Sequence, residues 1–409
     1  MVTLAKNKCH EAKSVLQQRD RTIVSLLLLD VTRLVNRLYD GTLPTGVDRV
    51  GIAYIEKYGH QARAVLSERG FVTTLGERDS QRVFGWLTGR ERATRTAIRA
   101  TVARAVATGW RRRPAVPGVL LNTSHTGMEY PRYYRSVAAR HARSVFMIHD
   151  LIPLTHAEYC RPGVDQQHRR RVRLALAHAD ALIANSQATF DTLAHEAELA
   201  GLPLPPTAVA HLASGMQPAG THARPLARPY FVMLGTIEPR KNHWLMLHVW
   251  RALVEKWGAA APTLVVIGRR GWECENVVDM LERCAPIRDF VIEKSNCSDA
   301  ELQAWLSHAQ ALLFPSFAEG YGIPLVEALE LGVPVIASRL DAFAEISPDI
   351  PDYLDPLDGR GWQQAIESYA EAGSPARAAQ LARIERFVAP TWDAHFEHVD
   401  ALLRTLTSA

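Results

Sequence analysis

The sequence lacks any long apolar run. Its longest uninterrupted apolar stretches, such as residues 26–29, are far shorter than the roughly 20 residues that a membrane-spanning helix needs. The first 21 residues carry several charges before any apolar run begins, so we expect no secretory signal there. Charged residues make up 22% of the 409 residues and no segment is of low complexity, which excludes a disordered or fibrous chain.

Cysteine is also scarce. The five cysteines are scattered, with no CxxC pair and no accompanying histidine cluster, so we expect neither a disulfide framework nor a structural zinc site. Free thiols are typical of a reducing cytoplasm, where we place the protein. No Asp-x-Asp motif follows any predicted strand, which argues against a metal ion held by carboxylates.

The net charge of +4 conceals an asymmetry between two halves of the chain. Residues 1–228 hold 32 Lys and Arg against 18 Asp and Glu, whereas residues 229–409 hold 15 against 25. A basic half and an acidic half predict two domains with different partners, the basic one facing something anionic. No recognised nucleic-acid motif accompanies the basic residues, so we do not expect nucleic acid as a partner.

Short apolar runs of strand length alternate with helical patterns along most of the chain. Such continuous apolar strands, separated by helices, are typical of parallel sheets in doubly wound α/β domains. The predicted strands are 22–30, 119–121, 144–148, 181–184, 230–234, 263–267, 290–292, 311–314 and 334–337. The predicted helices include 47–58, 165–178, 244–256, 277–284, 299–309, 324–331 and 392–406.

A stretch rich in proline and glycine, without apolar periodicity, interrupts this alternation and is typical of a linker. We therefore predict two Rossmann-like domains that face each other across a cleft. The predicted boundaries are 1–228 for the N-terminal domain (extension 1–22, linker 212–228), 229–390 for the C-terminal domain, and 391–409 for a helix that returns to the N-terminal domain.

The densest candidate site follows the predicted strand 311–314. Gly320 and Gly322 allow a ligand to approach the backbone closely, and Pro324 suits the first turn of the next helix. The free N–H groups at that helix start, such as those of Ile323 and Leu325, predict a phosphate or diphosphate site.

Two glutamates flank this helix start. Glu319 precedes it and Glu327 lies in its second turn, so both can face one pocket. Carboxylates repel phosphate but accept hydrogen bonds from hydroxyls, so a ribose and a sugar are the ligands that we predict for them. The alternative for a lone pair of glutamates is a solvated helix residue and a favourable charge at a helix start.

A second loop, residues 235–242, follows the strand 230–234. Arg240 and Lys241 stand at the carboxyl end of that strand, where two cations can neutralise a diphosphate. The alternative is a solvated turn with surface charges.

These stretches together resemble the retaining family-4 glycosyltransferases, which have the two-domain GT-B fold. In the C-terminal half the resemblance rests on LGTIEPRKN (234–242), LVVIGRRGW (264–272) and FPSFAEGYGIPLVEALELGVPVIAS (314–338), which contains Glu-x7-Glu. In the N-terminal half it rests on TGVDR (45–49), VFMIHDLIPL (145–154) and ADALIANSQAT (179–189). It extends over residues 24–400.

The resemblance implies a role for each matching residue. Glu319 matches the glutamate that contacts the hydroxyls of the donor sugar, Glu327 the glutamate that binds the ribose, and Lys241 the lysine at the diphosphate. His149 matches a histidine near the transferred sugar, and Gly46 a glycine that approaches the phosphate. The backbone at the sugar and diphosphate corresponds to Gly322, Ile323, Pro324 and Leu325, with Gly320 and Tyr321 beside it.

Two positions depart from the family pattern. Thr236 stands where many members have an arginine, so Arg240 is predicted to substitute for that arginine in the diphosphate clamp. Asp48 stands where a glycine is common in the N-terminal loop. His125 follows the strand 119–121 and is a second, weaker histidine candidate.

A basic segment, Arg90 to Arg113, carries apolar residues at helical spacing. It fits a helix that lies on an anionic membrane surface, and the alternative is an ordinary helix with a solvated basic face. The sequence by itself is consistent with both of these alternatives.

From these features we expect a cytoplasmic, retaining, metal-independent hexosyltransferase with no cofactor, and the inner face of the cell membrane is the position that we consider for it. It would transfer a sugar from a GDP- or UDP-sugar to a glycan or polyprenyl-linked glycan in bacterial cell-surface polysaccharide synthesis, such as lipopolysaccharide or capsule. The alternatives are a nucleotide-sugar epimerase of the same shape and a non-catalytic sugar-nucleotide-binding subunit.

Overall fold

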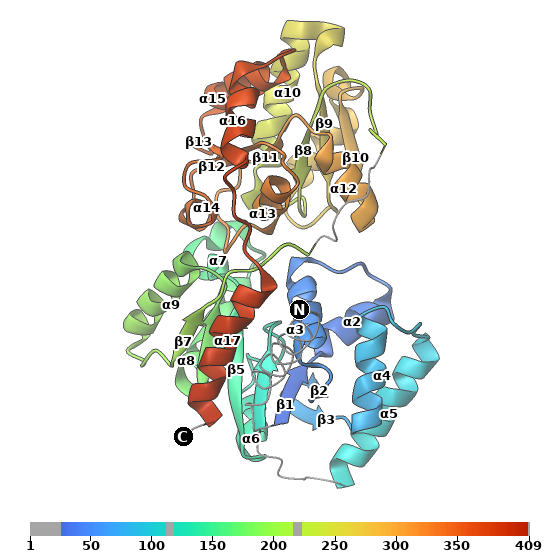
Figure 1. Ribbon diagram of the computed structural model, residues 1–409, viewed down its shortest axis with the longest axis vertical. Helices are drawn as coiled ribbons and strands as arrows, with labels where there is room; N and C mark the ends of the chain where they lie inside the picture. Colours follow the sequence, from blue (N-terminus) through green and yellow to red (C-terminus); the bar gives the residue numbers. More distant parts are fainter. Residues whose placement is uncertain (1–25, 112–117, 216–222, 408–409) are drawn as a thin grey trace, which may run out of the picture.

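The computed structural model describes residues 26–111, 118–215 and 223–407, with side chains described up to 107 in the first of these ranges. Two α/β domains lie one above the other in Figure 1, each built around its own parallel sheet. The predicted extension 1–22 lies outside the described residues, as does part of the predicted linker. No helix within the described residues is long and apolar enough to cross a membrane.

The sheet of the first domain has seven strands in the order β3-β2-β1-β4-β5-β6-β7. All neighbours are parallel except β2 and β3, which form an antiparallel edge. The central strands are apolar throughout because helices cover both faces. The strands are β1 (Leu26–Asp30), β2 (Ala62–Glu68), β3 (Phe71–Thr74), β4 (Gly118–Asn122), β5 (Ala142–Ile148), β6 (Ala181–Ala184) and β7 (Thr207–Val209).

The sheet of the second domain has six parallel strands in the order β10-β9-β8-β11-β12-β13. The order reverses beside β8, and ligands bind at such switch points in open parallel sheets. The strands are β8 (Tyr230–Leu234), β9 (Thr263–Ile267), β10 (Val291–Lys294), β11 (Leu312–Phe314), β12 (Val335–Ser338) and β13 (Asp352–Leu354).

Helices connect the strands and cover the sheets. In the first domain they are α2 (Thr32–Asp40), α3 (Gly46–Tyr58), α4 (Glu77–Leu87), α5 (Arg95–Arg111), α6 (Pro131–Ala138), α7 (Ile152–Thr155), α8 (Val164–His178) and α9 (Gln187–Ala200). In the second they are α10 (His243–Trp257), α11 (Glu275–Arg283), α12 (Asp299–Ser307), α13 (Ile323–Glu330), α14 (Asp341–Ile346), α15 (Gly359–Ala370) and α16 (Pro375–Ile384), and α17 (Trp392–Thr407) follows.

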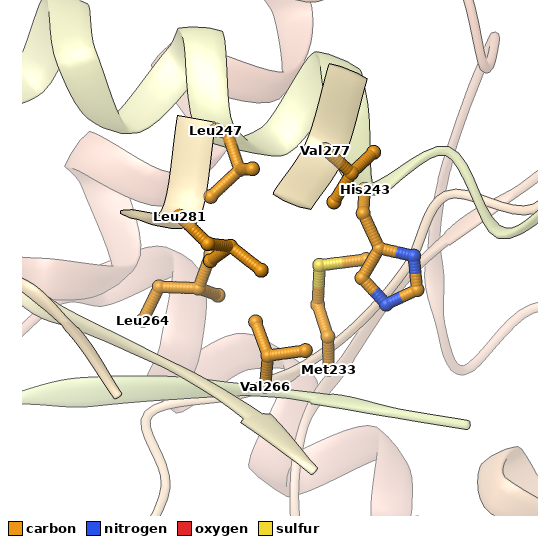
Figure 2. A pocket seen from close by; sticks show the side chains of 7 residues that line it. All are labelled: Met233, His243, Leu247, Leu264, Val266, Val277 and Leu281. Atoms are coloured by element: carbon orange, nitrogen blue, oxygen red, sulfur yellow. The ribbon is translucent and has the colours of Figure 1, made fainter. Parts of the chain in front are cut away.

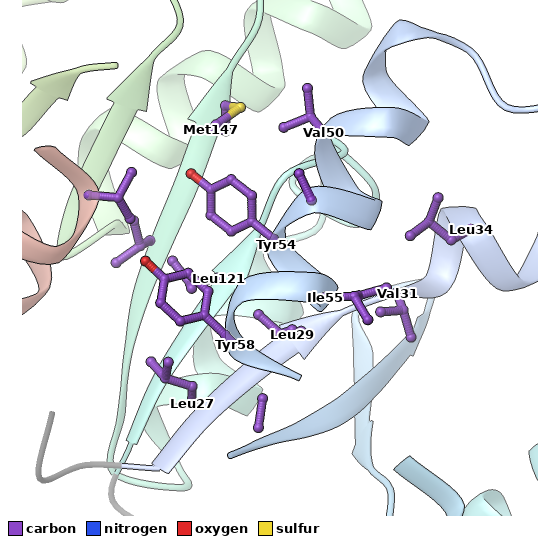
Figure 3. Packing of buried hydrophobic residues seen from close by; sticks show 14 of the residues in the cluster. Leu27, Leu29, Val31, Leu34, Val50, Tyr54, Ile55, Tyr58, Leu121 and Met147 are labelled. Atoms are coloured by element: carbon purple, nitrogen blue, oxygen red, sulfur yellow. The ribbon is translucent and has the colours of Figure 1, made fainter. Parts of the chain in front are cut away.

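The core of the first domain forms where α3 packs on the sheet. Figure 3 shows Tyr54 and Tyr58 of α3 over Leu27 and Leu29 of β1, and all four side chains are buried. Buried aromatic side chains of this size contribute much of the apolar area of a core. The packing fixes α3, and with it the start of this helix at Gly46.

The last helix, α17, runs back along the first domain (Figure 1). Its Phe396 packs edge-on against Tyr54 and Tyr58, at centroid distances of 5.1 and 5.3 Å. The Tyr58 hydroxyl donates to Asp400 at 2.7 Å, and the Tyr54 hydroxyl contacts His395 Nε2 at 2.9 Å. The chain therefore crosses between the domains twice, and α17 belongs to the core of the first domain.

Helix α5 contains much of the basic segment. Its Ile98 is buried in the core of the first domain, so this residue cannot contact a membrane. The helical spacing of apolar residues had suggested a membrane-facing apolar side, and the structure contradicts this for Ile98. Val106 is 62% exposed, and Arg104 pairs with Asp79 at 2.9 Å. Several arginines before and within the helix are exposed: Arg90, Arg92, Arg95 and Arg99. The side chains of residues 108–113 lie outside the described part of the chain.

The packing of α17 can be tested with Phe396→Ala. Removing this buried ring should lower the free energy of unfolding by about 3–5 kcal/mol, because a cavity forms between α3 and α17. Chemical unfolding followed by circular dichroism measures the change. Glu397→Ala, an exposed position next to it, is the matched control and should stay within about 0.5 kcal/mol of the wild type. Equal stability of the two variants would contradict this packing.

Candidate active site

The carboxyl ends of both sheets face each other, and the two domains touch there. The carbonyl of Gly320 accepts hydrogen bonds from Ser186 Oγ at 2.7 Å and from Thr189 Oγ1 at 3.0 Å. A Cβ atom at position 320 would lie 2.0 Å from the carbonyl oxygen of His149, so only glycine fits this contact. The loop after β11 is thus held against the loop after β5.

Glu319 lies at this contact and binds two cations. Its Oε2 accepts from Arg240 Nη1 at 2.6 Å, and its Oε1 from Lys241 Nζ at 2.5 Å. Ser316 Oγ donates to the same Oε1 at 2.7 Å. The structure therefore brings Glu319 together with Lys241, which lies 78 residues before it in the chain, and with the adjacent Arg240.

The two neighbouring cations determine the protonation state of Glu319. Burial alone would raise the pKa of Glu319, but Arg240 and Lys241 outweigh burial and lower the pKa to about 2. Burial lowers the pKa of Lys241, and Glu319 counteracts part of that effect. Glu319 is consequently a carboxylate at any pH at which the protein is used, as a hydrogen-bond acceptor for hydroxyls must be.

Arg240 is engaged on two sides. Its Nε donates to the buried Glu238 at 2.6 Å, and its Nη1 also donates to the carbonyl of Ala318 at 3.0 Å. Lys241 Nζ lies 4.8 Å from the centre of the Phe314 ring and next to Gly235, whose φ is 136°. Arg240 therefore fixes the loop that carries Glu319, and Lys241 is the cation that stands nearer to the glycine turn after β8.

The start of α13 is a glycine with φ of 139°. A Cβ atom on Gly322 would lie 2.9 Å from the ring of Phe343, so both the conformation and the space require glycine. The N–H groups of Leu325 and Val326 donate to the Gly322 carbonyl at 2.9 and 3.2 Å. These two amides are occupied, which differs from the free donors that the sequence suggested at this helix start.

The start of α3 faces the start of α13. A Cβ atom on Gly46 would lie 3.3 Å from Ile323 Cδ1. Asp48 caps this helix through the backbone N–H of Thr45 at 2.7 Å and is itself bound by Arg33 and Arg37, at 2.7 and 2.8 Å. Asp48 is thus a structural cap where the family pattern has glycine.

Glu327 is bound by a residue of the other domain. Arg49 of α3 donates to its Oε1 at 2.9 Å and also pairs with Asp299 of the second domain. Burial raises the pKa of Glu327 to about 7, although Arg49 opposes this shift. Sequence reasoning missed Arg49, and its place in the TGVDR stretch was the available signal.

His149 is buried at the end of β5. Its Nε2 lies 2.7 Å from the carbonyl of Thr123, so this nitrogen carries the proton and Nδ1 is the acceptor. Burial lowers the pKa of His149 and of His125, whose ring centre is 5.3 Å away and whose Nε2 accepts from the His149 N–H. Both rings are therefore neutral near pH 7.

Tyr321 points away from these groups. Its ring is buried, and its hydroxyl donates to the carbonyl of Leu212 in the segment that connects the domains. Its side chain is therefore occupied by the domain connection, while its backbone stays in the glycine-rich loop. Within the described residues, no group of three or more His, Cys, Asp or Glu side chains could hold a metal ion.

The sequence is similar to those of known glycosyltransferases. Residues 220–349 match the family described as Glycosyl transferases group 1. The serotype-specific mannosyltransferase WbdA of Escherichia coli is 28% identical over 264 residues, which are 60% of this chain and 32% of that protein. The O-antigen chain mannosyltransferase RfbU of Salmonella typhimurium is 32% identical over 142 residues, 34% of this chain and 38% of that protein. The chain thus spans about a third of the length of these curated relatives.

Solved structures resemble the whole fold. Anabaena HepE in complex with UDP-glucose superposes with a TM-score of 0.60 at 16% identity, covering 94% of this chain and 99% of that one. The α,α-trehalose 6-phosphate synthase of Burkholderia multivorans gives 0.59 at 11% identity, with the same two coverages. The predicted GT-B arrangement of two Rossmann-like domains is confirmed.

The charge of Glu319 predicts a pH-dependent contribution to stability. Because its pKa is lowered to about 2 in the folded protein, the carboxylate stabilises the fold above the unfolded value near 4.5 and loses this effect as the pH falls toward 2. Relative to Glu319→Gln, the wild type should gain up to about 3 kcal/mol at pH 7 and roughly 1 kcal/mol less at pH 4.

Urea unfolding at a series of pH values measures this difference. Glu397→Gln, at an exposed site on α17, is the control and should show no comparable change with pH. A difference between the wild type and Glu319→Gln that stays constant from pH 7 to pH 3 would contradict the pairing.

Proposed function

We propose that the protein is a retaining glycosyltransferase that moves a sugar from a nucleotide-sugar donor to a glycan acceptor. The observation that carries this proposal is the ionised Glu319, held between Arg240 and Lys241 next to Gly320, which packs on the backbone of His149 at the domain boundary. A carboxylate beside two cations suits a ligand that carries both hydroxyls and a diphosphate.

Each group has a role in this reaction. The diphosphate would lie at Lys241, Gly235 and the start of α13, with Glu319 at the hydroxyls of the donor sugar. As the bond between the anomeric carbon and the diphosphate breaks, Lys241 and Arg240 stabilise the negative charge on the leaving oxygen. The acceptor oxygen would then form the new bond on the same face of the sugar, and its proton would pass to the leaving diphosphate oxygen, which gives a retaining reaction.

The nucleotide would use Glu327. Its carboxyl group is suited to accept hydrogen bonds from the ribose, but Arg49 occupies one of its oxygens. Donor binding would therefore have to replace or share the contact with Arg49. The names of the curated relatives make mannose, linked to GDP or UDP, the first donor sugar to test.

The acceptor is proposed from the same relatives, one of which, RfbU, is named for the O-antigen chain. A glycan in surface polysaccharide synthesis, free or linked to a polyprenyl carrier, fits this class. The exposed arginines around α5 would place the basic domain near an anionic membrane by charge alone, since Ile98 is buried. The cytoplasmic side of the membrane is the corresponding location.

Substitutions separate the two glutamates. Glu319→Ala should lower turnover by about 100-fold or more, because it removes a contact to the reacting sugar and frees two cations. Glu327→Ala should weaken nucleoside diphosphate binding by about 1–3 kcal/mol in calorimetry. Glu397→Ala, at an exposed site on α17, is the control for the second variant. Full turnover in a folded Glu319→Ala protein would refute the assignment.

The same assay distinguishes the rival functions. A glycosyltransferase releases nucleoside diphosphate faster when an acceptor is present. An epimerase would convert the nucleotide sugar without any need for an acceptor, and a non-catalytic subunit would bind it and leave it unchanged. Product analysis of GDP- and UDP-sugars, with and without acceptor, assigns one of the three.

Metal independence is a separate prediction. Lys241 and Arg240 supply positive charge at the proposed diphosphate position, so the reaction should keep its rate in excess EDTA. Turnover with and without the chelator is the measurement. Loss of activity that magnesium or manganese restores would show that these side chains are insufficient.

A further inference from the structure

A groove next to the candidate active site has no role in the function proposed above. It lies at the carboxyl ends of β8, β9, β11 and β13 in the second domain and has a volume of about 350 Å³. The lining residues that matter here are Glu238, His243, Trp244, Glu273, Asn276 and Phe317. Glu327 and α13 do not line it, so it is separate from the positions proposed for the ribose.

The lining combines aromatic faces with acceptors of hydrogen bonds. Trp244 is 42% exposed at the start of α10, and Phe317 is partly exposed in the loop before Glu319. Glu273 and Asn276 are exposed beside them, between β9 and the first turns of α11. Aromatic rings suit the apolar faces of sugar rings, and carboxylate and amide groups suit their hydroxyls. The carboxylates of Glu238 and Glu273, which both line the groove, also disfavour a phosphate there.

His243 adds a buried polar atom without a partner. Its side chain is 3% exposed, and Nδ1 has no hydrogen bond. Figure 2 shows its ring beside a small apolar void, with both nitrogens pointing away from the leucine side chains. Burial, and to a smaller degree Lys241, lowers the pKa of His243 to about 3, so the ring is neutral. An unpaired buried nitrogen at a groove is suited to a ligand hydroxyl or a bound water.

Side-chain contacts connect the lining of the groove to the proposed reacting groups. Glu238 binds Arg240 Nε, and Arg240 binds Glu319, with both distances at 2.6 Å. Phe317 stacks on Tyr159 of the first domain, with ring centres 5.2 Å apart and 14° between the planes. The groove therefore lies close to Glu319 and beside the boundary between the two domains.

We propose that this groove is a subsite for a neutral saccharide unit of the acceptor chain, located beyond the unit that receives the new sugar. The proposal rests on the glycosyltransferase function proposed above. Trp244 provides the stacking surface, and Glu273 and Asn276 bind hydroxyls. Longer acceptors would then bind more tightly than shorter ones because they reach the groove.

Binding without a donor tests the subsite independently of activity. The probes are α-linked mannose oligosaccharides of one to five units and a matching glucose series, measured by calorimetry or ligand-observed NMR. Affinity should rise with length in the wild type. Trp244→Ala should remove most of that increase, on the order of tenfold for the longest probe. Asn276→Ala should act in the same direction.

Matched controls distinguish the loss of a binding contact from the unfolding of a variant. Arg251→Ala, exposed on α10, should bind every probe like the wild type, and thermal unfolding should show that all variants are folded. GDP and UDP should bind the wild type and Trp244→Ala equally. A weaker nucleotide affinity in Trp244→Ala would assign the groove to the donor and overturn the proposal.

The remaining outcomes are also decisive. No oligosaccharide binding by the wild type, or equal binding by the wild type and Trp244→Ala, overturns the subsite even if sugar transfer is found. Length-dependent binding that needs Trp244, without transfer from any nucleotide sugar, supports the subsite and refutes the proposed function instead. The two hypotheses can therefore fail separately.

Discussion

The arrangement of the cleft depends on one buried interaction, the binding of Glu319 by Arg240 and Lys241. Burying a carboxylate without partners is costly, and this pair of cations makes the charged form the stable one. The same contacts join the loop after β8 to the loop after β11. If Glu319 were neutral, the two cations would repel each other and the glycine-rich turn that follows would lose its support.

A second set of contacts joins the domains at the same place. Gly320 packs on His149, and Arg49 reaches from α3 to Glu327 and Asp299. The groups proposed for the donor are thus partly bound to each other. A nucleotide sugar would exchange these contacts for its own, so donor binding and the relative position of the domains should be coupled.

The sequence predicted most of the central architecture because buried parallel strands are continuous apolar runs. Residues 181–184, 230–234 and 263–267 were predicted with the bounds that the structure has. The hairpin of β2 and β3 was missed, since an edge with one exposed face mixes polar and apolar residues. The partnership of Arg49 with Glu327 spans 278 positions, and no local pattern can reveal such a contact. The lining of the groove comes from four separate loops and was missed for the same reason.

The Glu-x7-Glu motif does not determine the charge states of Glu319 and Glu327. They are eight residues apart and chemically identical, yet the pKa of Glu319 is lowered to about 2 and that of Glu327 is raised to about 7. Both are buried, so burial does not distinguish them. Glu319 has two cations within 2.6 Å, whereas Glu327 has Arg49 alone and also lies near the negative charges of Asp299 and Glu330. The different charge states therefore arise from the surrounding loops and from the other domain, so the chemical role of each glutamate depends on the contacts that the fold gives it.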